Sequence, residues 1–325
     1  MTLNARVGSN TEHFTLWRGV VGSRYTRRVP HVHPTSMIGD NGGIDPSASV
    51  GPFCVLEGAV RLGPGVRLLG HNWIRGPVEI GAGTTMYPFA TVGLPPQHTG
   101  RDHEAPSAGV RIGVGVTLRE QSSVHSAMNE TEPTRIGDGS YLMNSAHVGH
   151  DCRLGERVIV ASGSVIGGHV EIGSGAFISG LVAIHQRVRI GRGAMTTGSV
   201  AFSIDLPPFC VAVDRNIMTG INRVGMRRAG IPREEITAAC EAFRRAFRTP
   251  RTRDDMLDVL DEIGARSACV REMADFVRET KRGIMAGDGR PRAHVVAWLR
   301  KRFMVLPDAA HGVDVAAEAE MERVD

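Results

Sequence analysis

The chain has 325 residues, of which 42% are hydrophobic, and a formal net charge of +4, as in an ordinary soluble globular protein. The charge is small for this length, and no Lys/Arg cluster interleaves with aromatic residues, so we expect no nucleic-acid partner. Residues 1–31 contain no apolar run long enough for a signal peptide, and no later stretch reaches the ~18 apolar residues of a membrane span. These observations predict a cytoplasmic protein that does not span a membrane.

The numbers of glycines and cysteines narrow the expected fold and cellular compartment. Forty glycines against 5% aromatic residues predict many tight turns and a core without large rings. The cysteines are odd in number, scattered and without a C-x-x-C pair: Cys54, Cys152, Cys210, Cys240 and Cys269. This spacing predicts no disulfide framework and fits a reducing compartment.

From residue 32 onward an apolar residue recurs at every sixth position. The register covers residues 32–92, resumes over 112–124 and continues over 136–202, with Thr196 as its one polar member. Glycine often follows the apolar residue, as at Gly39 and Gly155. One inward aliphatic side chain per short strand, followed by a turn, predicts a parallel β-helix with three hexads in each coil of about 18 residues. Helical spacing of 3.6 residues does not appear before about residue 230.

Two insertions interrupt the six-residue register, and we predict that both are loops extruded from the β-helix, at residues 94–111 and 126–135. The first is "LPPQHTGRDHEAPSAGVR" and the second lies within "HSAMNETEPTR". Loops of this kind are where function tends to collect.

The composition changes after Pro207 and Pro208. The stretch "IPREEITAACEAFRRAFR" places Ile236, Cys240 and Phe243 on one helical face. We therefore predict a leader at residues 1–31, a β-helix at 32–207, a linker and α-helical domain at 208–305, and a flexible acidic tail at 306–325. An arginine cluster near the start of the helical part is either a surface for phosphate or an acidic protein, or a solvated helix face: Arg223, Arg227, Arg228, Arg233, Arg244, Arg245, Arg248, Arg251 and Arg253.

Histidines recur at nearly one coil length in the second half of the repeat. His150, His169 and His185 are separated by 19 and 16 residues, which predicts one edge on successive coils, roughly 5–10 Å apart, and His125 falls one coil earlier. They could be surface histidines, zinc ligands or catalytic bases. A zinc site needs three ligands at ~2.0–2.1 Å from one ion, and stacked coils spread these side chains too widely. We favour general-base catalysis, because an imidazole can accept a proton near neutral pH.

Several motifs around these histidines occur in order within residues 32–256: "NSAHVGHDC", "IGGHVEI", "AIHQ", "DLPPF" and "MRRAG". In this the chain resembles the acyl-[acyl-carrier-protein]–UDP-N-acetylglucosamine O-acyltransferase family, which starts lipid A synthesis. The resemblance implies a left-handed parallel β-helix followed by a C-terminal α-helical domain, assembled as a homotrimer. It also implies transfer of a fatty acyl group, of the 3-hydroxyacyl type, from acyl carrier protein to a hydroxyl or amine of a UDP-N-acetylglucosamine-type sugar. Neither a cofactor nor a metal is implied.

The resemblance also implies roles for individual residues. His150 is the general base, Asp151 orients it, and the Gly168 N–H is the oxyanion hole. Gly198 is the position that sets acyl-chain length. Predicted substrate contacts are His125, His147, His169, His185 and Gln186, with Asn222 at the uracil and Arg228 at the nucleotide phosphates or carrier protein.

Two departures from the family concern the acceptor sugar. An acidic and a basic residue that contact the glucosamine are replaced by the segment Gln97 to Gly100, and Val224 stands where the family has Glu. Either the acceptor is an altered UDP-sugar, or His98 and Arg101 do the same work from a rearranged loop. An acetyl-CoA-dependent acetyltransferase and a non-catalytic or metal-binding β-helix are the alternatives. The long, arginine-rich helical part disfavours the acetyltransferase.

Overall fold

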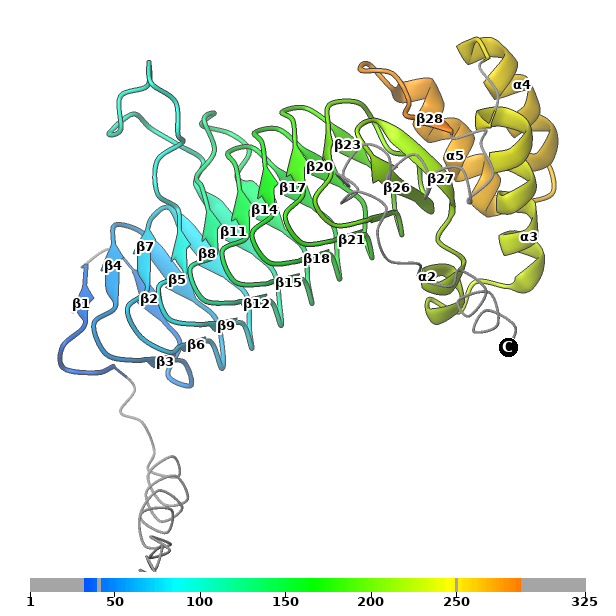
Figure 1. The fold of residues 1–325 in the computed structure, drawn as a ribbon. Coiled ribbons are helices and arrows are strands. Elements are labelled where there is room, and N and C mark those ends of the chain that lie inside the picture. Colours follow the sequence, from blue (N-terminus) through cyan, green and yellow to red (C-terminus); the bar gives the residue numbers. More distant parts are fainter. Residues whose placement is uncertain (1–31, 40–41, 249–250, 288–325) are drawn as a thin grey trace, which may run out of the picture. The chain divides into compact units, whose positions relative to one another are not determined.

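The computed structural model describes residues 32–39, 42–248 and 251–287, and residues 32–221 of this part form a parallel β-helix closed by a hairpin (Figure 1). Successive short strands pass to each of three sheets in turn, so that every third strand pairs in parallel with the strand one coil earlier. The predicted leader and acidic tail, and the helical spacing predicted beyond residue 288, lie outside the described residues.

Sheets A, B and C are the three faces of the β-helix. Sheet B contains β1 (Met37–Ile38), β4 (Val55–Glu57), β7 (Trp73–Arg75), β10 (Thr91–Val92), β13 (Ser123–Val124), β16 (His147–Val148), β19 (Val165–Ile166), β22 (Ala183–Ile184) and β25 (Ala201–Phe202). Sheet C contains β2 (Gly43–Ile44), β5 (Val60–Leu62), β8 (Val78–Ile80), β11 (Val110–Ile112), β14 (Thr134–Ile136), β17 (Arg153–Leu154), β20 (Glu171–Ile172) and β23 (Arg189–Ile190). Sheet A contains β3 (Ser49–Val50), β6 (Arg67–Leu68), β9 (Thr85–Met86), β12 (Thr117–Leu118), β15 (Tyr141–Leu142), β18 (Ile159–Val160), β21 (Phe177–Ile178), β24 (Met195–Thr196), β26 (Cys210–Asp214), β27 (Ile217–Ile221) and β28 (Ala286–Gly287).

The six-residue register is the core of these coils. Every register position from residue 50 to residue 202 is buried, including Thr196. A second buried column, which the pattern does not predict, lies two residues earlier in each hexad and holds small side chains such as Val66, Ser140 and Ala176. These residues stand at the corners, where three faces converge and only a small side chain fits. All five cysteines are free, as predicted from their spacing.

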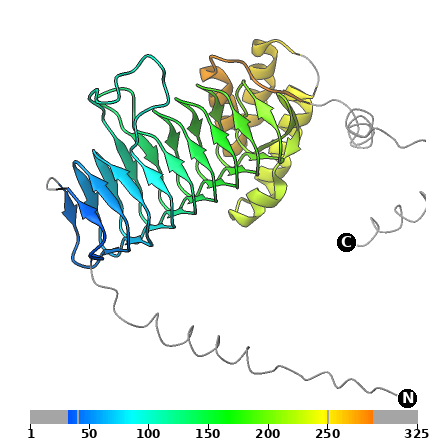
Figure 2. The same cartoon turned by 60° about the vertical axis from the view of Figure 1, so that its left-hand side comes forward.

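Both extruded loops leave the β-helix at the same corner, between sheet B and sheet C (Figure 2). Strand pairing resumes at Val110 and Thr134, so the loops are residues 93–109 and 125–133, and each ends two residues earlier than predicted. The physical reason is that Val110 and Thr134 are themselves corner residues of the small buried column. They already belong to the coil.

Residues 210–221 are not the linker predicted for this region. They form the antiparallel pair β26 and β27, which continues sheet A beyond the last parallel strand. Cys210, Ala212 and Met218 of this hairpin are fully buried, so its apolar residues cover the end of the core. Asn216 supplies a positive φ of 58° in the tight turn.

Helices follow the hairpin, as predicted, and gather at the C-terminal end of the coils (Figure 1). They are α2 (Arg223–Arg228), α3 (Arg233–Ala242), the π-helical turn η1 (Phe243–Phe247), α4 (Arg253–Gly264) and α5 (Ala268–Glu279). The N-termini of α4 and α5 are capped by the hydroxyls of Thr252 and Ser267. No helix in the described part of the chain combines the length and apolar character needed to cross a bilayer.

Polar contacts attach α5 to the last coils. Arg192 of the β-helix pairs with Glu272 at 2.7 Å. The carboxylate of Asp205, which is buried, accepts hydrogen bonds from the Arg189 N–H at 2.9 Å and from the Thr280 hydroxyl at 2.7 Å. Because a buried carboxylate is stable only when it is hydrogen-bonded, these contacts fix the chain after α5 against the β-helix.

Thr196, the one polar residue of the six-residue register, leads to a testable prediction. The Thr196 hydroxyl accepts a hydrogen bond at 2.9 Å from the backbone N–H of Ser179 on the preceding coil. Thr196→Val keeps the shape but leaves that N–H without an acceptor, so we expect a loss of about 1–3 kcal/mol in the free energy of unfolding, measured by urea titration. Thr196→Ser keeps the hydroxyl and is the control. A Thr196→Val variant as stable as the wild type would contradict this account.

Candidate active site

The predicted histidines lie at the corner where the chain turns from sheet B to sheet C. Because coils repeat every 18 residues, the position of His150 is followed by Gly168 and Gln186, and the position of Asp151 by His169 and Arg187. His150, His169 and His185 therefore share one edge, as predicted, but stand in three neighbouring columns. The imidazoles do not form a simple ladder.

His150 and Asp151 form a buried hydrogen-bonded pair at this corner. The distance from His150 Nδ1 to Asp151 Oδ2 is 2.7 Å, and their side chains are only 10% and 6% exposed. His169 lies edge-on to His150 with ring centroids 5.0 Å apart, and its Nε2 is 3.6 Å from Asp151 Oδ2. Asp151 and His169 have positive φ values of 58° and 59°, which turn both side chains out of the coil.

Hydrogen bonds keep the Asp151 carboxylate ionised. Its burial favours the neutral acid, but bonds from His150, the Met128 N–H and the Asn129 amide outweigh burial and lower the pKa of Asp151 to about 2. Since an ionised carboxylate only accepts hydrogen bonds, Nδ1 of His150 must carry the proton. The lone pair of His150 is then on Nε2, as a general base requires.

Gly168 faces the imidazole of His150 from the next coil. A Cβ on Gly168 would lie 2.4 Å from both Cε1 and Nε2 of that ring, so only glycine leaves room for it. Within the described residues the Gly168 N–H has no hydrogen-bond acceptor, although Gly168 is buried. A free, buried N–H beside a general base can stabilise negative charge that develops on a carbonyl oxygen.

A second histidine pair adjoins the first. The rings of His125 and His147 are 5.0 Å apart, the Ser123 hydroxyl lies 2.9 Å from Nδ1 of His147, and Nδ1 of His125 donates to the Pro95 carbonyl at 2.7 Å. Burial lowers the pKa of His147 to about 4, helped by the neighbouring His125 and His150. Burial also lowers the pKa of His125. Both are therefore neutral at pH 7 and available as hydrogen-bonding groups.

These groups surround a small cavity of about 220 Å³. Its walls include His125, His147, His150, Gly168 and Gln186, with Gln97 from the first extruded loop. The structure thus brings together a base, a free N–H and neutral polar groups, the set required for acyl transfer to a hydroxyl.

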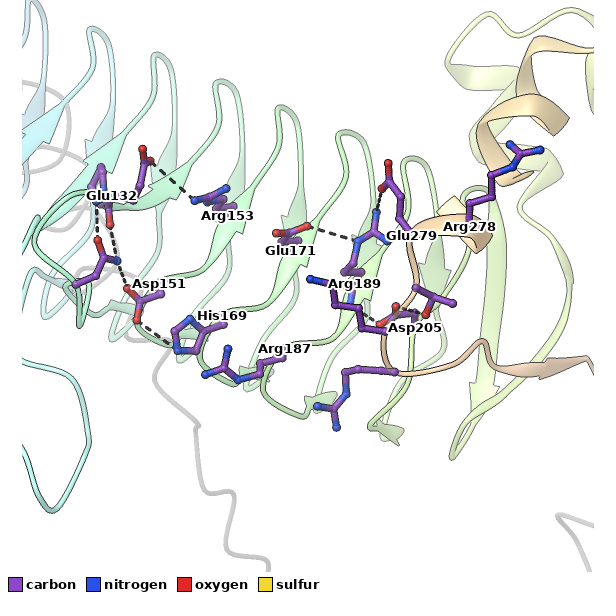
Figure 3. Close-up of a pocket in the computed structure, with 15 residues that line it drawn as sticks. Glu132, Asp151, Arg153, His169, Glu171, Arg187, Arg189, Asp205, Arg278 and Glu279 are labelled. Carbon is purple, nitrogen blue, oxygen red and sulfur yellow. Dashed lines mark hydrogen bonds and ion pairs between the residues drawn. The ribbon is translucent and has the colours of Figure 1, made fainter. Parts of the chain in front are cut away.

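A wider groove of about 1020 Å³ lies on the other side of Asp151 and His169 (Figure 3). It runs along sheet C past Arg153, Arg187 and Arg189 to the segment after α5. Arg189 is paired with Glu279 at 2.8 Å, whereas Arg187 has no carboxylate partner in the described structure. This groove can take an elongated anionic ligand, but the base opens into the smaller cavity.

The two loop residues predicted to hold the sugar lie outside that cavity. His98 is exposed, and its Nδ1 accepts a hydrogen bond from the Gly100 N–H at 3.2 Å. The guanidinium of Arg101 donates to the carbonyls of Met128 and Pro106, each at 2.7 Å. All three hydrogen bonds are internal to the protein, and the predicted substrate contacts of His98 and Arg101 stay predictions.

The remaining predicted residues lie further from His150. His185 is exposed beside Arg282, whose Nη2 is 3.4 Å from its Nδ1. Gly198 is exposed at the corner between sheets A and B, which is a different edge of the β-helix. Asn222 caps α2, since its Oδ1 accepts from the Gly225 N–H at 2.9 Å, and Arg228 is exposed at the end of α2.

Sequence reasoning missed the groups that hold the His150–Asp151 pair in place. The Met128 N–H and the Asn129 amide belong to the second extruded loop, and Ser123 lies on β13. The insertion of this loop next to the histidine register was the available signal. The insertion does not indicate which of its atoms contact Asp151.

His150, Asp151 and His169 also offer ligand atoms within 4.8 Å of one another, the one such group in the part of the chain that the structure describes. A metal ion there would have to replace the 2.7 Å hydrogen bond between His150 and Asp151. The predicted absence of a metal and of a cofactor stays a prediction.

The neutral second pair predicts a pH dependence of stability. Because the pKa of His147 is lowered on folding, the unfolded chain takes up this proton first, and stability falls as the pH drops from about 6.5 towards 4. The contribution should be about 1–2 kcal/mol, since His147 is only partly buried. Denaturant titrations from pH 4 to 8 should show a shallower loss for His147→Asn, with His185→Asn as an exposed control. An unchanged slope in His147→Asn would refute this.

Two family profiles match the chain. The profile described as "Udp N-acetylglucosamine O-acyltransferase; Domain 2" matches residues 205–285, and the bacterial transferase hexapeptide profile (six repeats) matches residues 133–168. Among solved structures, the UDP-N-acetylglucosamine acyltransferase of Francisella novicida has a TM-score of 0.75 at 26% identity, covering 81% of this chain and 95% of that one. The Campylobacter jejuni enzyme of the same name has a TM-score of 0.73 at 30% identity, over 78% of this chain and 99% of that one.

Curated relatives have the same name, and the match to this chain covers most of their length. The acyl-[acyl-carrier-protein]–UDP-N-acetylglucosamine O-acyltransferase of Thermodesulfovibrio yellowstonii is 36% identical, covering 78% of this chain and 98% of the relative. The corresponding protein of Caulobacter vibrioides is 42% identical, covering 76% and 94%. The predicted fold is confirmed as the left-handed parallel β-helix with a C-terminal helical region. The chain belongs to the acyl-[acyl-carrier-protein]–UDP-N-acetylglucosamine O-acyltransferase family.

Proposed function

We propose that this chain transfers a fatty acyl group, of the 3-hydroxyacyl type, from acyl carrier protein to a UDP-N-acetylglucosamine-type sugar. The observation that carries the proposal is the buried His150–Asp151 pair beside the free N–H of Gly168. Membership of this acyltransferase family supplies the reaction class.

The reaction follows from the position of each group. His150 Nε2 takes the proton of the sugar hydroxyl, or amine, as its oxygen or nitrogen attacks the thioester carbonyl of the donor. The Gly168 N–H stabilises the negative charge on that carbonyl oxygen, and Asp151 stabilises the imidazolium. Collapse of the tetrahedral intermediate breaks the C–S bond, and the leaving thiolate of the carrier receives the proton from His150. No covalent enzyme intermediate is needed.

The surface charges support an acidic carrier protein as partner. Arg223, Arg227 and Arg228 are exposed on α2, and the groove beside Asp151 presents Arg187, which has no carboxylate partner among the described residues. Positive surfaces of this kind attract an acidic protein and orient its approach. Such a donor is cytoplasmic, and we place the reaction at the acylation that begins lipid A synthesis.

The acceptor is either UDP-N-acetylglucosamine or a ring-modified relative. The exposed His98 and the internally bonded Arg101 differ from the acidic and basic pair expected of the family, which favours a changed contact with the sugar. Sites built on hydrogen bonds discriminate strongly when those partners change. Both sugars therefore belong in any activity assay.

We further propose a homotrimer whose sites lie between subunits. Gly198 is at a corner different from that of His150, and Asn222 and Arg228 lie on and beside α2, so one protomer does not gather all the predicted contacts around the cavity. A second copy that packs against the histidine corner would supply them.

The base assignment predicts that His150→Ala lowers transfer by about 10²–10⁴-fold. The β-helix should still fold, because the imidazole lies at a corner outside the aliphatic register and the Met128 N–H and the Asn129 amide still donate to Asp151. Purified protein, acyl-carrier thioesters and a panel of UDP-sugars, followed by mass spectrometry, measure the rate. Near-normal turnover in His150→Ala would refute the assignment, and wild-type protein that acylates none of the panel would refute the function.

The chain-length position generates a further prediction. Gly198 has no side chain to limit an acyl groove, so Gly198→Met should shift preference towards shorter donors by several tenfold steps, at ~0.8 kcal/mol for each CH₂ that is no longer buried. Competition between donors of different length measures the shift. An unchanged profile would place the determinant of length elsewhere.

A further inference from the structure

Among the hydrogen bonds between the two extruded loops are those of one partly buried guanidinium, that of Arg101. Arg101, in the loop of residues 93–109, is partly buried and donates from Nη1 to the Met128 carbonyl and from Nη2 to the Pro106 carbonyl, each at 2.7 Å. Pro106 belongs to the same loop as Arg101, whereas Met128 belongs to the loop of residues 125–133. Arg101 therefore ties the loops together through backbone atoms.

Met128 is held at both of its backbone polar atoms. Its carbonyl accepts from Arg101, and its N–H donates to the Asp151 carboxylate at 3.1 Å to Oδ1 and 3.2 Å to Oδ2. The adjacent Asn129 side chain donates to Oδ1 at 2.6 Å. The carboxylate that orients His150 is thus fixed from the second loop, and that loop is fixed by Arg101.

Other hydrogen bonds keep the loops in place without fixing residue 128. The Ser107 hydroxyl donates to the Ala127 carbonyl at 2.6 Å, and the Ala108 N–H donates to the Asn129 carbonyl at 2.8 Å. Within the described residues, Arg101 is the one donor to the Met128 carbonyl. Loss of Arg101 should therefore loosen residue 128 while the loops and the β-helix remain folded.

We propose that Arg101 is a positioning residue that holds the catalytic pair in register through Met128 and Asp151, and that it does not contact the sugar. The proposal rests on the function proposed for His150. Small displacements of a catalytic group cost large factors in rate, because the reacting atoms leave the geometry of attack. Arg101 should therefore affect turnover more than binding.

The test measures kcat and KM for both substrates in Arg101→Gln, Arg101→Lys and a matched control, Arg75→Gln. Arg75 pairs with Glu104 at 2.6 Å in the same loop region but has no contact with Met128. We expect Arg101→Gln to lower kcat by about 10–100-fold with KM within about twofold. Arg101→Lys, which can reach one carbonyl, should be intermediate, and Arg75→Gln should resemble the wild type.

A double-mutant cycle separates this route from a direct contact. In an Asp151→Asn background, Arg101→Gln should lower kcat by less than about twofold, because residues that act as one unit are not additive. Full additivity would overturn the proposal. So would an increase in KM for the UDP-sugar with kcat unchanged, since that result would place Arg101 at the acceptor.

Amide hydrogen exchange tests the same link without any assay of activity. Arg101→Gln and Asp151→Asn should each accelerate exchange in the peptide of residues 126–133, which contains the Met128 N–H, and Arg75→Gln should not. Unchanged protection in Arg101→Gln would refute the link. Faster exchange in a protein that acylates no UDP-sugar would uphold the link and refute the proposed function instead.

Discussion

Backbone hydrogen bonds between successive coils are the constraint on which the site depends. The pairing of His147 with Val165, and of Val165 with Ala183, places each corner over the corner 18 residues away. The strand pairing therefore places Gly168 one coil after His150, and a glycine there leaves room for the imidazole. A shift that brought His169 to this position would put a side chain where the ring stands. The strand pairing therefore sets the position of the His150 imidazole relative to the Gly168 N–H.

The electrostatics of the corner follow from which buried groups receive hydrogen bonds. The Asp151 carboxylate accepts several hydrogen bonds, which lower its pKa and keep it charged, whereas burial lowers the pKa of His125 and His147 and keeps both neutral. One anion is thus surrounded by neutral polar groups. In the proposed reaction, an imidazolium on His150 is stabilised by that anion, and neither His125 nor His147 adds a positive charge beside it.

The six-residue register predicted the coils, the buried aliphatic column and the edge that carries the histidines, because each of these depends only on position in the repeat. It did not predict the small corner column, since the converging backbones, and not a pattern of hydrophobicity, select Val66 or Ala176. The register could not predict the hydrogen bonds of Arg101, Met128 and Asn129, for another reason. They join two insertions that follow no repeat, and the sequence of a loop does not give its path. The segment 210–221 was assigned to a linker because the hexad register ends there, although its apolar residues continue sheet A as a hairpin.

That hairpin has a consequence for association. A stack of parallel coils exposes unpaired N–H and C=O groups at its last strand, and such an edge can recruit further strands from another molecule. At the C-terminal end, β27 runs antiparallel to β26, and β28 covers its outer side. Another coil cannot continue the parallel pattern across this reversal. In sheet A, the hairpin and β28 therefore occupy the edge where a further coil would pair, which opposes growth of this sheet by strands of another molecule.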